Sequence, residues 1–260
     1  MKVNLICYVL MFASQLYAND LVTPSKCVAH RGNSKFYLEN STAAIKSAVE
    51  LGVDGIELDV RHTFDGYPIL LHDRTLSRVA KSRDGFRCPL NKNVNDLYFF
   101  TIRMNCVLKN GEEIPYLKNI LDLIPLEKIE LYFELKDSPS DNSIELIGSY
   151  LSQMKKANFI SFNSNFLART SRLLERQNVT NNRVNFYKVY LIYLFHRHEY
   201  NVDVLYNSIN FKRLVNSEND VLSGIWTVDD EDTMQLAFKN GINFITTNNP
   251  GLCLMLKDQE

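Results

Sequence analysis

Short apolar runs alternate with helix-period stretches along almost the whole of this 260-residue chain. Ala44, Ile45, Ala48 and Val49 have the spacing of one buried helical face, and Gly52 lies just beyond it. Strands that alternate with helices of roughly 10–15 residues are typical of βαβ units and a parallel sheet. The strands that this pattern predicts are residues 27–31, 55–60, 68–72, 130–136, 159–162, 185–195, 204–209, 224–228 and 243–246.

The length of the chain favours one closed α/β barrel. Residues 19–260 remain after a predicted N-terminal signal, which is close to the roughly 250 residues of a TIM (β/α)₈ barrel. A doubly wound open sheet is the competing architecture, because periodicity does not separate the two. The stretch of about residues 74–113 lacks the regular alternation. We expect it to form a small insertion after the second strand region, not a second domain.

The N-terminus has the layout of an export signal. Lys2 supplies a short positive region, an unbroken apolar run covers residues 5–13, and the small residue Ala18 ends a segment suited to cleavage. This apolar run is too short to cross a bilayer, which takes about 20 residues. We therefore predict a cleaved signal peptide at residues 1–18 and a periplasmic or secreted protein with no stable membrane insertion. A retained interfacial anchor is the alternative.

The composition excludes several other classes of protein. With 45% hydrophobic and 23% charged residues, the chain can bury a substantial core and does not resemble a disordered sequence. Its formal net charge is −1, and it has no long block of Lys or Arg. Neither a nucleic-acid partner nor an anionic membrane surface is therefore expected. The oligomeric state is left open.

Four cysteines remain once the signal is removed, and disulfides persist in the oxidising compartment that an export signal implies. Cys88 and Cys106 lie in the same polar, strand-poor stretch, which predicts a disulfide that closes this loop. Two reduced, buried thiols are the alternative. Cys27 and Cys253 are expected to be buried thiols.

Two carboxylates share one face of a predicted strand. Glu57 and Asp59 are two residues apart, so both point one way while their apolar neighbours point the other way. Both faces of a parallel sheet are normally apolar, and two adjacent buried carboxylates repel each other and are costly to desolvate. The pair indicates that something positive binds between them. An edge strand with its carboxylates in water is the alternative interpretation.

A similar pattern returns at Glu134 and Lys136, which share one face of another predicted strand. If both strands belong to one barrel, Glu57, Asp59 and Glu134 can converge at its mouth. Three carboxylates form a hard site suited to Ca²⁺ or Mg²⁺. No CxxC or HExxH arrangement favours zinc. We therefore predict a divalent metal site.

His30 and His72 each follow a predicted strand, and barrel enzymes carry their chemistry at the carboxyl ends of strands. Two imidazoles can act as general base and general acid across one phosphorus atom. Arg31 offers a planar fork for phosphate oxygens, and Lys136 offers a point charge. The remaining histidines lack such a setting, and surface or core roles are expected for His62, His196 and His198.

Read together, these residues resemble the opening signature of the glycerophosphodiester phosphodiesterase family in order and spacing. The residues that match are His30, Arg31, Gly32, Glu39, Asn40, Ser41, Ala44, Ala48, residues 52–60, Thr63, Asp65, Gly66, His72 and Asp73. Weaker matches follow at residues 114–115, 134–136, 161–162, 226–228 and 241–250, so the resemblance spans essentially the whole mature chain.

The resemblance implies a TIM barrel with a small insertion after the second strand region. It also implies metal-dependent hydrolysis of glycerophosphodiesters, such as glycerophosphocholine, to glycerol 3-phosphate and an alcohol. By the same resemblance, the metal ligands are Glu57, Asp59 and Glu134, and the acid/base pair is His30 and His72. The residues implied in substrate binding are Arg31 and Lys136 at the phosphate, Glu39 near the metal, and Phe162 and Trp226 in the pocket lining.

Three features depart from the family pattern. Ser41 stands where the family usually has Thr, and Asn248 stands where Asp is common. Residues 35–38, just before Glu39, differ from the segment with Gly or Pro that is more common there. These departures put the substrate preference in doubt, not the activity. Two rival functions remain: a related sphingomyelinase D-like phospholipase that acts on intact lipids, and an inactive secreted binding protein that keeps the fold. Within the hydrolase mechanism, direct attack by water and a cyclic phosphate route both stay open.

Overall fold

The computed structural model describes residues 25–177, 182–191, 200–216 and 222–259. Eight parallel strands form a closed barrel, because β1 hydrogen-bonds to β2 on one side and to β11 on the other. The strands in barrel order are β1 (Lys26–His30), β2 (Gly55–His62), β6 (Glu130–Leu135), β7 (Lys156–Ser161), β8 (Val184–Tyr190), β9 (Asn201–Leu205), β10 (Ser223–Trp226) and β11 (Phe244–Thr247). The predicted TIM barrel is confirmed, and closure excludes the open sheet.

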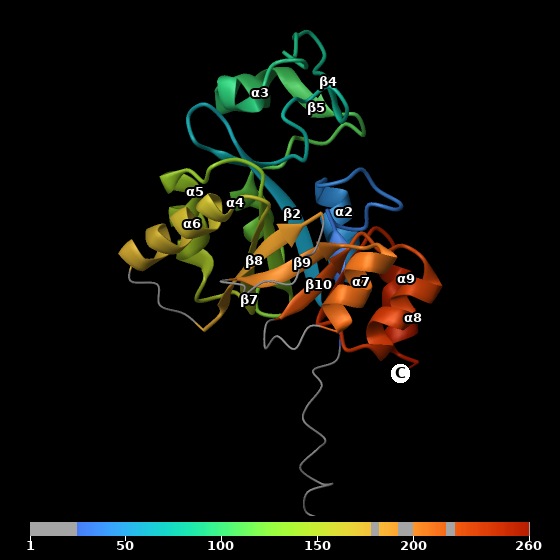
Figure 1. The fold of residues 1–260 in the computed structure, drawn as a ribbon. Helices are drawn as coiled ribbons and strands as arrows, with labels where there is room; N and C mark the ends of the chain where they lie inside the picture. Colours follow the sequence, from blue (N-terminus) through green and yellow to red (C-terminus); the bar gives the residue numbers. More distant parts are fainter. Residues whose placement is uncertain (1–24, 178–181, 192–199, 217–221, 260) are drawn as a thin grey trace, which may run out of the picture.

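Helices surround this barrel (Figure 1). The helix predicted around Ala44 is α2, which begins after Ser41, whose hydroxyl accepts a hydrogen bond from the Ala44 N–H, and ends at the left-handed Gly52. The helices around the barrel are α2 (Thr42–Leu51), α4 (Leu117–Leu121), α5 (Asp141–Tyr150), α6 (Ser164–Arg176), α7 (Ser208–Val215), α8 (Glu231–Lys239) and α9 (Pro250–Lys257).

The insertion after β2 forms a small unit of its own at one end of the barrel (Figure 1). Strand β3 (Pro68–Leu70) pairs antiparallel with the end of β2 and leads into it. The insertion then contains β4 (Ala80–Ser82), the 3₁₀ turn η1 (Val94–Asp96), α3 (Phe99–Asn105) and β5 (Cys106–Leu108), with β4 and β5 paired antiparallel. The predicted Cys88–Cys106 disulfide is present and lies in the apolar cluster of this unit.

Two apolar regions hold the barrel together. Strand residues that face outward pack against the helices, and those that face inward form a separate cluster that fills the lumen. Gly224 on β10 shows how tightly the lumen is filled, since a Cβ atom there would collide with the ring of Phe244 on β11. The inward-facing cluster consists of Val28, Tyr132, Ile160, Tyr187, Val189 and Phe244, with Trp226 packed against it.

The expectation for the other two cysteines was wrong. Cys27 and Cys253 are both fully buried, but they form a disulfide that joins β1 to α9, across a sequence separation of 226 residues. Their pairing is a consequence of barrel closure, which brings the first strand against the last helix. Nothing in the local sequence around either cysteine indicates this proximity.

Some predicted boundaries also differ. The strand expected at residues 204–209 lies earlier, as β9, and Ser208 already begins α7. The strand expected at 185–195 is β8, and its predicted continuation over residues 192–199, with His196 and His198, lies outside the described residues. The predicted signal at residues 1–18 also lies outside them. Among the described helices, none is long and apolar enough to cross a membrane.

Candidate active site

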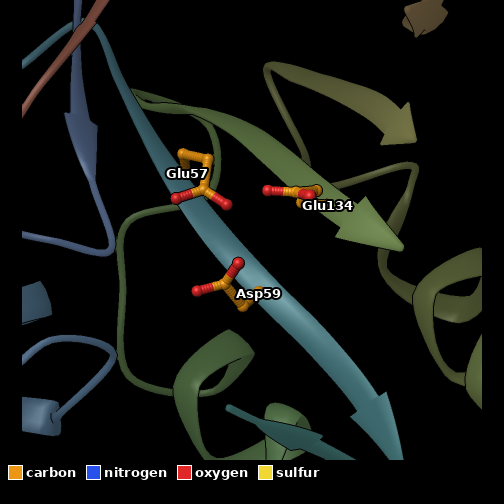
Figure 2. Close-up of side chains that lie close together, drawn as sticks. All are labelled: Glu57, Asp59 and Glu134. Atoms are coloured by element: carbon orange, nitrogen blue, oxygen red, sulfur yellow. The ribbon is translucent and has the colours of Figure 1, made fainter. Parts of the chain in front are cut away.

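Three carboxylates lie side by side on two neighbouring barrel strands (Figure 2). Glu57 and Asp59 project from β2, and Glu134 projects from β6 directly opposite Asp59. One carboxylate oxygen from each residue lies within 4.8 Å of the others. Glu57 and Asp59 are buried, at 3% and 0% exposure, so the cluster is not a solvated acidic patch. The alternative of an edge strand with carboxylates in water is therefore wrong.

Two cations lie against this cluster. The Lys136 ammonium is 2.6 Å from Glu134 and 3.1 Å from Asp59, and the Arg31 Nε is 2.9 Å from the other oxygen of Asp59. Burial opposes the charged form of Asp59, but Lys136 and Arg31 hold its pKa at about 2. Burial and the neighbouring carboxylates Asp59 and Glu134 raise the pKa of Glu57 well above its ordinary value. The two cations thus compensate the charge of Asp59, whereas ionisation of Glu57 stays unfavourable.

The donor set fits a divalent cation. Oxygen-only ligands at this spacing suit Ca²⁺ or Mg²⁺. Glu57 Oε1 is buried and has no hydrogen-bond partner in the described structure, although buried carboxylate oxygens are normally paired. A cation among the three side chains would satisfy that oxygen and remove the penalty that raises the pKa of Glu57.

The turn after β1 places Arg31 against the carboxylates. Arg31 has a left-handed backbone with φ 58°, and Gly32 follows with φ 83°. A Cβ atom at Gly32 would lie 2.6 Å from the backbone of Ala44, so this position accepts glycine only. The Arg31 N–H donates to Glu57 at 3.0 Å, and its guanidinium turns back to Asp59. The backbone and side chain of Arg31 therefore connect β1 to both acidic residues of β2.

His30, the last residue of β1, is held through its Nδ1 atom. This nitrogen lies 2.7 Å from the Asn248 Oδ1, and Asn248 donates in turn to Asp229 at 2.7 Å. The other ring nitrogen, Nε2, is on the side of Glu57, at 4.0 Å. Burial, followed by the charge of Arg31, lowers the pKa of His30 to about 4. His30 is therefore a neutral imidazole at pH 7, with one nitrogen fixed by Asn248.

His72 reaches the site by a different route from the one expected. The strand predicted to carry it is β3, which ends at Leu70, runs antiparallel to β2 and lies outside the closed barrel. Arg61 donates two hydrogen bonds to the His72 carbonyl oxygen, at 3.0 and 2.8 Å, and anchors the backbone there. The His72 Nδ1 lies 2.8 Å from the Asp73 carboxylate. His72 thus depends on side-chain contacts, whereas His30 is built into the barrel.

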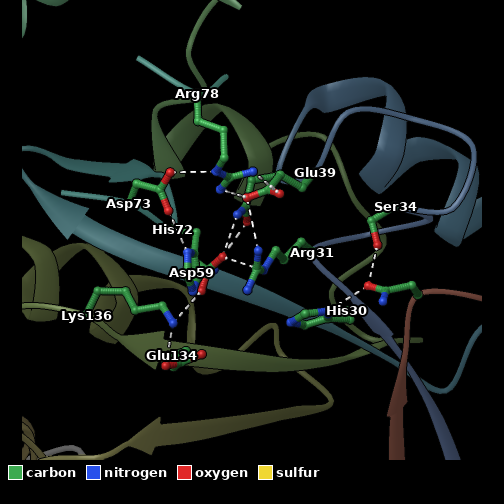
Figure 3. A network of polar contacts seen from close by, with 12 residues as sticks. His30, Arg31, Ser34, Glu39, Asp59, His72, Asp73, Arg78, Glu134 and Lys136 are labelled. Carbon is green, nitrogen blue, oxygen red and sulfur yellow. Dashed lines mark hydrogen bonds and ion pairs between the residues drawn. The ribbon is translucent and has the colours of Figure 1, made fainter. Parts of the chain in front are cut away.

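A chain of charged contacts links the two histidine segments (Figure 3). Arg78, from the insertion, donates to Asp73 at 2.6 Å and to both oxygens of Glu39 at 2.7 Å. Glu39 also accepts from Arg31 at 3.0 Å. Glu39 is therefore not one of the clustered carboxylates. It joins the β1–α2 loop to the insertion.

Two hollows meet at His30. One is a small cavity of about 20 Å³ inside the barrel, lined by Glu57, Glu134 and Trp226 among others. The other is a larger pocket of about 520 Å³ under the β1–α2 loop, which Arg31 also lines. Trp226 contacts Phe162 edge to face at 5.7 Å on the barrel side, so both predicted aromatic residues lie at the mouth.

The structure places Arg31, Lys136 and His30 beside the three carboxylates. Glu39 is held apart from them by Arg31 and Arg78, and Phe162 packs on Trp226. The structure also shows several residues that the sequence did not single out. Asn40 donates to Asp59 at 2.7 Å and accepts from the Asp59 N–H at 3.2 Å, a role that the motif alone did not indicate. Asn248 was noted only as a departure from the family pattern. Asp73 and Arg78 had no assigned role, and neither Asp203, which lines the small cavity, nor Asp229 was singled out.

His62 is buried and bonds to Ser143, which is a core role as expected.

The class of protein follows from where this cluster lies. TIM barrels carry their active sites at the carboxyl ends of the strands. Glu134 is the last residue but one of β6 and pairs with Asp59, and Glu57 pairs with His30, the last residue of β1. The molecule is thus a barrel enzyme whose candidate active site is an acidic cluster flanked by two cations.

Comparison with known proteins specifies the family. The model of the "Glycerophosphoryl diester phosphodiesterase family" matches residues 30–252. A glycerophosphodiester phosphodiesterase of Caldanaerobacter subterraneus subsp. tengcongensis is 30% identical over 241 residues, which cover 86% of this chain and 93% of that protein. The chain belongs to the glycerophosphoryl diester phosphodiesterase family, and it is a phosphoric diester hydrolase.

Solved structures share the fold. A glycerophosphodiester phosphodiesterase from Thermotoga maritima has a TM-score of 0.65 and 19% identity, covering 89% of this chain and 98% of its own. A phosphodiesterase from Oleispira antarctica, solved in complex with the product sn-glycerol-3-phosphate, has a TM-score of 0.69 and 17% identity, covering 90% and 97%.

Proposed function

We propose that this enzyme hydrolyses glycerophosphodiesters to glycerol 3-phosphate and an alcohol, with a divalent cation and the pair His30 and His72. The observation that carries the proposal is the buried cluster of Glu57, Asp59 and Glu134, flanked by Arg31 and Lys136. The family and the glycerophosphodiester phosphodiesterase relative support the same substrate class.

Each residue has a role in this proposal. A divalent cation held by the three carboxylates would polarise a non-bridging phosphate oxygen and lower the pKa of a bound hydroxyl. Arg31 and Lys136 bind the other phosphate oxygens and stabilise the charge that develops on them. His30 is neutral and accepts the proton of the nucleophile through Nε2, because its Nδ1 is engaged by Asn248. His72, whose Nδ1 lies 2.8 Å from the Asp73 carboxylate, protonates the departing alkoxide.

The nucleophile is either water or the adjacent glycerol hydroxyl. In the first route water yields glycerol 3-phosphate directly, and in the second a cyclic phosphate forms and is then opened by water. Both routes use one base and one acid on opposite sides of the phosphorus. Quenching the reaction early and looking for a cyclic glycerophosphate distinguishes them.

The test is the release of glycerol 3-phosphate from glycerophosphocholine, glycerophosphoethanolamine and glycerophosphoglycerol, with added Ca²⁺ or Mg²⁺ and with chelator. We expect turnover that chelator abolishes and that one of the two cations restores. Glu57→Gln should abolish it at any practical cation concentration. Glu145→Gln, on the exposed face of α5, is the matched control and should keep it.

Sphingomyelin and lysophosphatidylcholine are tested beside these diesters. Faster turnover of the intact lipids would replace the proposal with the sphingomyelinase D-like alternative. Absence of cation-dependent turnover on every diester would replace it with a binding protein of the same fold.

We also propose that the protein is exported, with residues 1–18 as a cleaved signal. The disulfides Cys27–Cys253 and Cys88–Cys106 support an oxidising compartment. The test is the N-terminal sequence of the mature protein recovered from the periplasm or medium. An uncleaved protein retained with the cytosol would contradict the proposal.

A further inference from the structure

The larger pocket under the β1–α2 loop carries an inference that deepens the proposed function and rests on it. His30 and Arg31 line this pocket together with Lys35, Glu39 and Asn248. Its volume of about 520 Å³ lies in the range of small-molecule sites, which is roughly 300–1,000 Å³. The barrel cavity on the other side of His30 has about 20 Å³, room for a single water or hydroxyl. Of the two hollows that meet at His30, the larger one has space for the alcohol part of a diester.

The loop that forms the pocket is held in place at several points. The Lys35 N–H donates to the Asn248 carbonyl at 3.1 Å, and the Ser34 hydroxyl donates to the Asn248 side chain at 2.9 Å. The buried Asn33 donates its backbone N–H to Ala44 at 2.9 Å. These bonds fix the backbone of Lys35 at the rim, next to the histidine that Asn248 also binds.

The residues that line the pocket carry more positive than negative charge. Among the described residues that line it, Glu39 is the only carboxylate, and both of its oxygens are already bound by Arg31 and Arg78. Burial opposes ionisation of Glu39, but these guanidinium groups lower its pKa, so it remains charged and paired. Lys35 forms no ion pair with any carboxylate in the described part of the chain. Its ammonium lies 5.6 Å above the Phe36 ring.

We infer that this pocket receives the charged end of the substrate's alcohol, beyond the oxygen that leaves beside His72, and that Lys35 makes the enzyme prefer alcohols that carry an anionic group over purely cationic ones. An ammonium that has no carboxylate partner attracts a carboxylate or phosphate and repels a choline or ethanolamine cation. Lys35 belongs to the segment 35–38, where this sequence departs from the usual family pattern. The specificity is therefore a property of this chain.

The matched substrates are glycerophosphoserine and glycerophosphoethanolamine, which differ by one carboxylate on the same skeleton. We expect the wild-type enzyme to have the higher kcat/KM for glycerophosphoserine, by roughly 2- to 5-fold, as for an exposed charge pair. Raising the salt concentration should shrink this ratio, because exposed charges are screened. Lys35→Gln should bring the ratio close to one, and Lys35→Glu should reverse it.

Lys46→Gln, an exposed position on α2 that does not line the pocket, is the control and should keep the wild-type ratio. Thermal unfolding checks that each variant is folded. An equal ratio in wild type and Lys35→Gln overturns the inference while diester hydrolysis stands. A preference for glycerophosphocholine that is lost in Trp226→Leu overturns it too, because the alcohol would then bind at Trp226 and Phe162. Failure to hydrolyse any of these diesters with cation present rejects the proposed function itself.

Discussion

Arg78 holds both carboxylate oxygens of Glu39, at 2.7 Å each, and so ties the insertion to the loop that follows the first barrel strand. Its third contact, to Asp73, reaches the residue that orients His72. The two histidines come from different parts of the fold. His30 is part of the closed barrel, whereas His72 follows an antiparallel hairpin strand outside it. Arg78 therefore links the position of His72 to that of the loop that follows His30.

Replacing Arg78 by Gln should therefore lower kcat by roughly 10- to 100-fold, as expected when a catalytic group is slightly misplaced. KM should change much less, because Arg31 and Lys136 still bind the phosphate. Arg78→Lys should recover part of the loss. Arg83→Gln is the matched control, because it removes another ion pair of the insertion, to Glu113, without contact with the site. Equal effects of the Arg78 and Arg83 substitutions would show that Arg78 acts only through the stability of the insertion.

The two histidines should be separable by the choice of leaving group. Either His30→Ala or His72→Ala should reduce kcat for glycerophosphocholine by roughly 10²–10⁴-fold. A p-nitrophenyl diester departs without protonation, so it should restore much of the activity of His72→Ala and little of that of His30→Ala. Steady-state kinetics on the two substrates measures this difference. Rescue of His30→Ala but not of His72→Ala would show that His30 is the acid and His72 the base. Normal turnover of glycerophosphocholine by either variant would show that the replaced histidine is not catalytic.

The Cys27–Cys253 disulfide should stabilise the barrel more than the Cys88–Cys106 disulfide does. In the chain-entropy account, the stabilisation grows with the length of chain that the bond closes, and the two sequence separations are 226 and 18 residues. Replacing Cys27 and Cys253 together by Ala should lower the free energy of unfolding by roughly 3–5 kcal/mol, and replacing Cys88 and Cys106 by roughly 2–3 kcal/mol. Urea unfolding of both double variants measures the two losses. A larger loss for the second pair would contradict this ranking.

His62 should make the fold sensitive to mild acid. Burial lowers its pKa from 6.5 to about 4 in the folded protein, while the unfolded chain keeps the ordinary value. The unfolded state therefore binds the proton first, and stability falls as the pH drops from about 6.5 to about 4, by roughly 2–3 kcal/mol in all. His62→Gln should lose this part of the pH dependence. Urea unfolding of both proteins at several pH values measures the difference between their slopes, and identical slopes would contradict the prediction.

Much of the site was predictable because neighbouring residues on a strand have a fixed geometry. Glu57 and Asp59 face the same way because side chains alternate along a strand, and this needs no knowledge of the fold. The resemblance over residues 30–73 then gave the barrel and the acid/base pair. The expectation that His72 follows a barrel strand was wrong, because local periodicity cannot distinguish a parallel barrel strand from an antiparallel hairpin strand.

The sequence by itself determined the alternation that builds a barrel and the residue types that make a hard cation site. Only the tertiary structure decided which distant residues meet: Glu134 opposite Asp59, Asn248 at the ring of His30, and Cys253 at Cys27. The physical reason is that spacing along one strand is set by covalent geometry, whereas the register between strands and the closure of the ring depend on the packing of the whole chain.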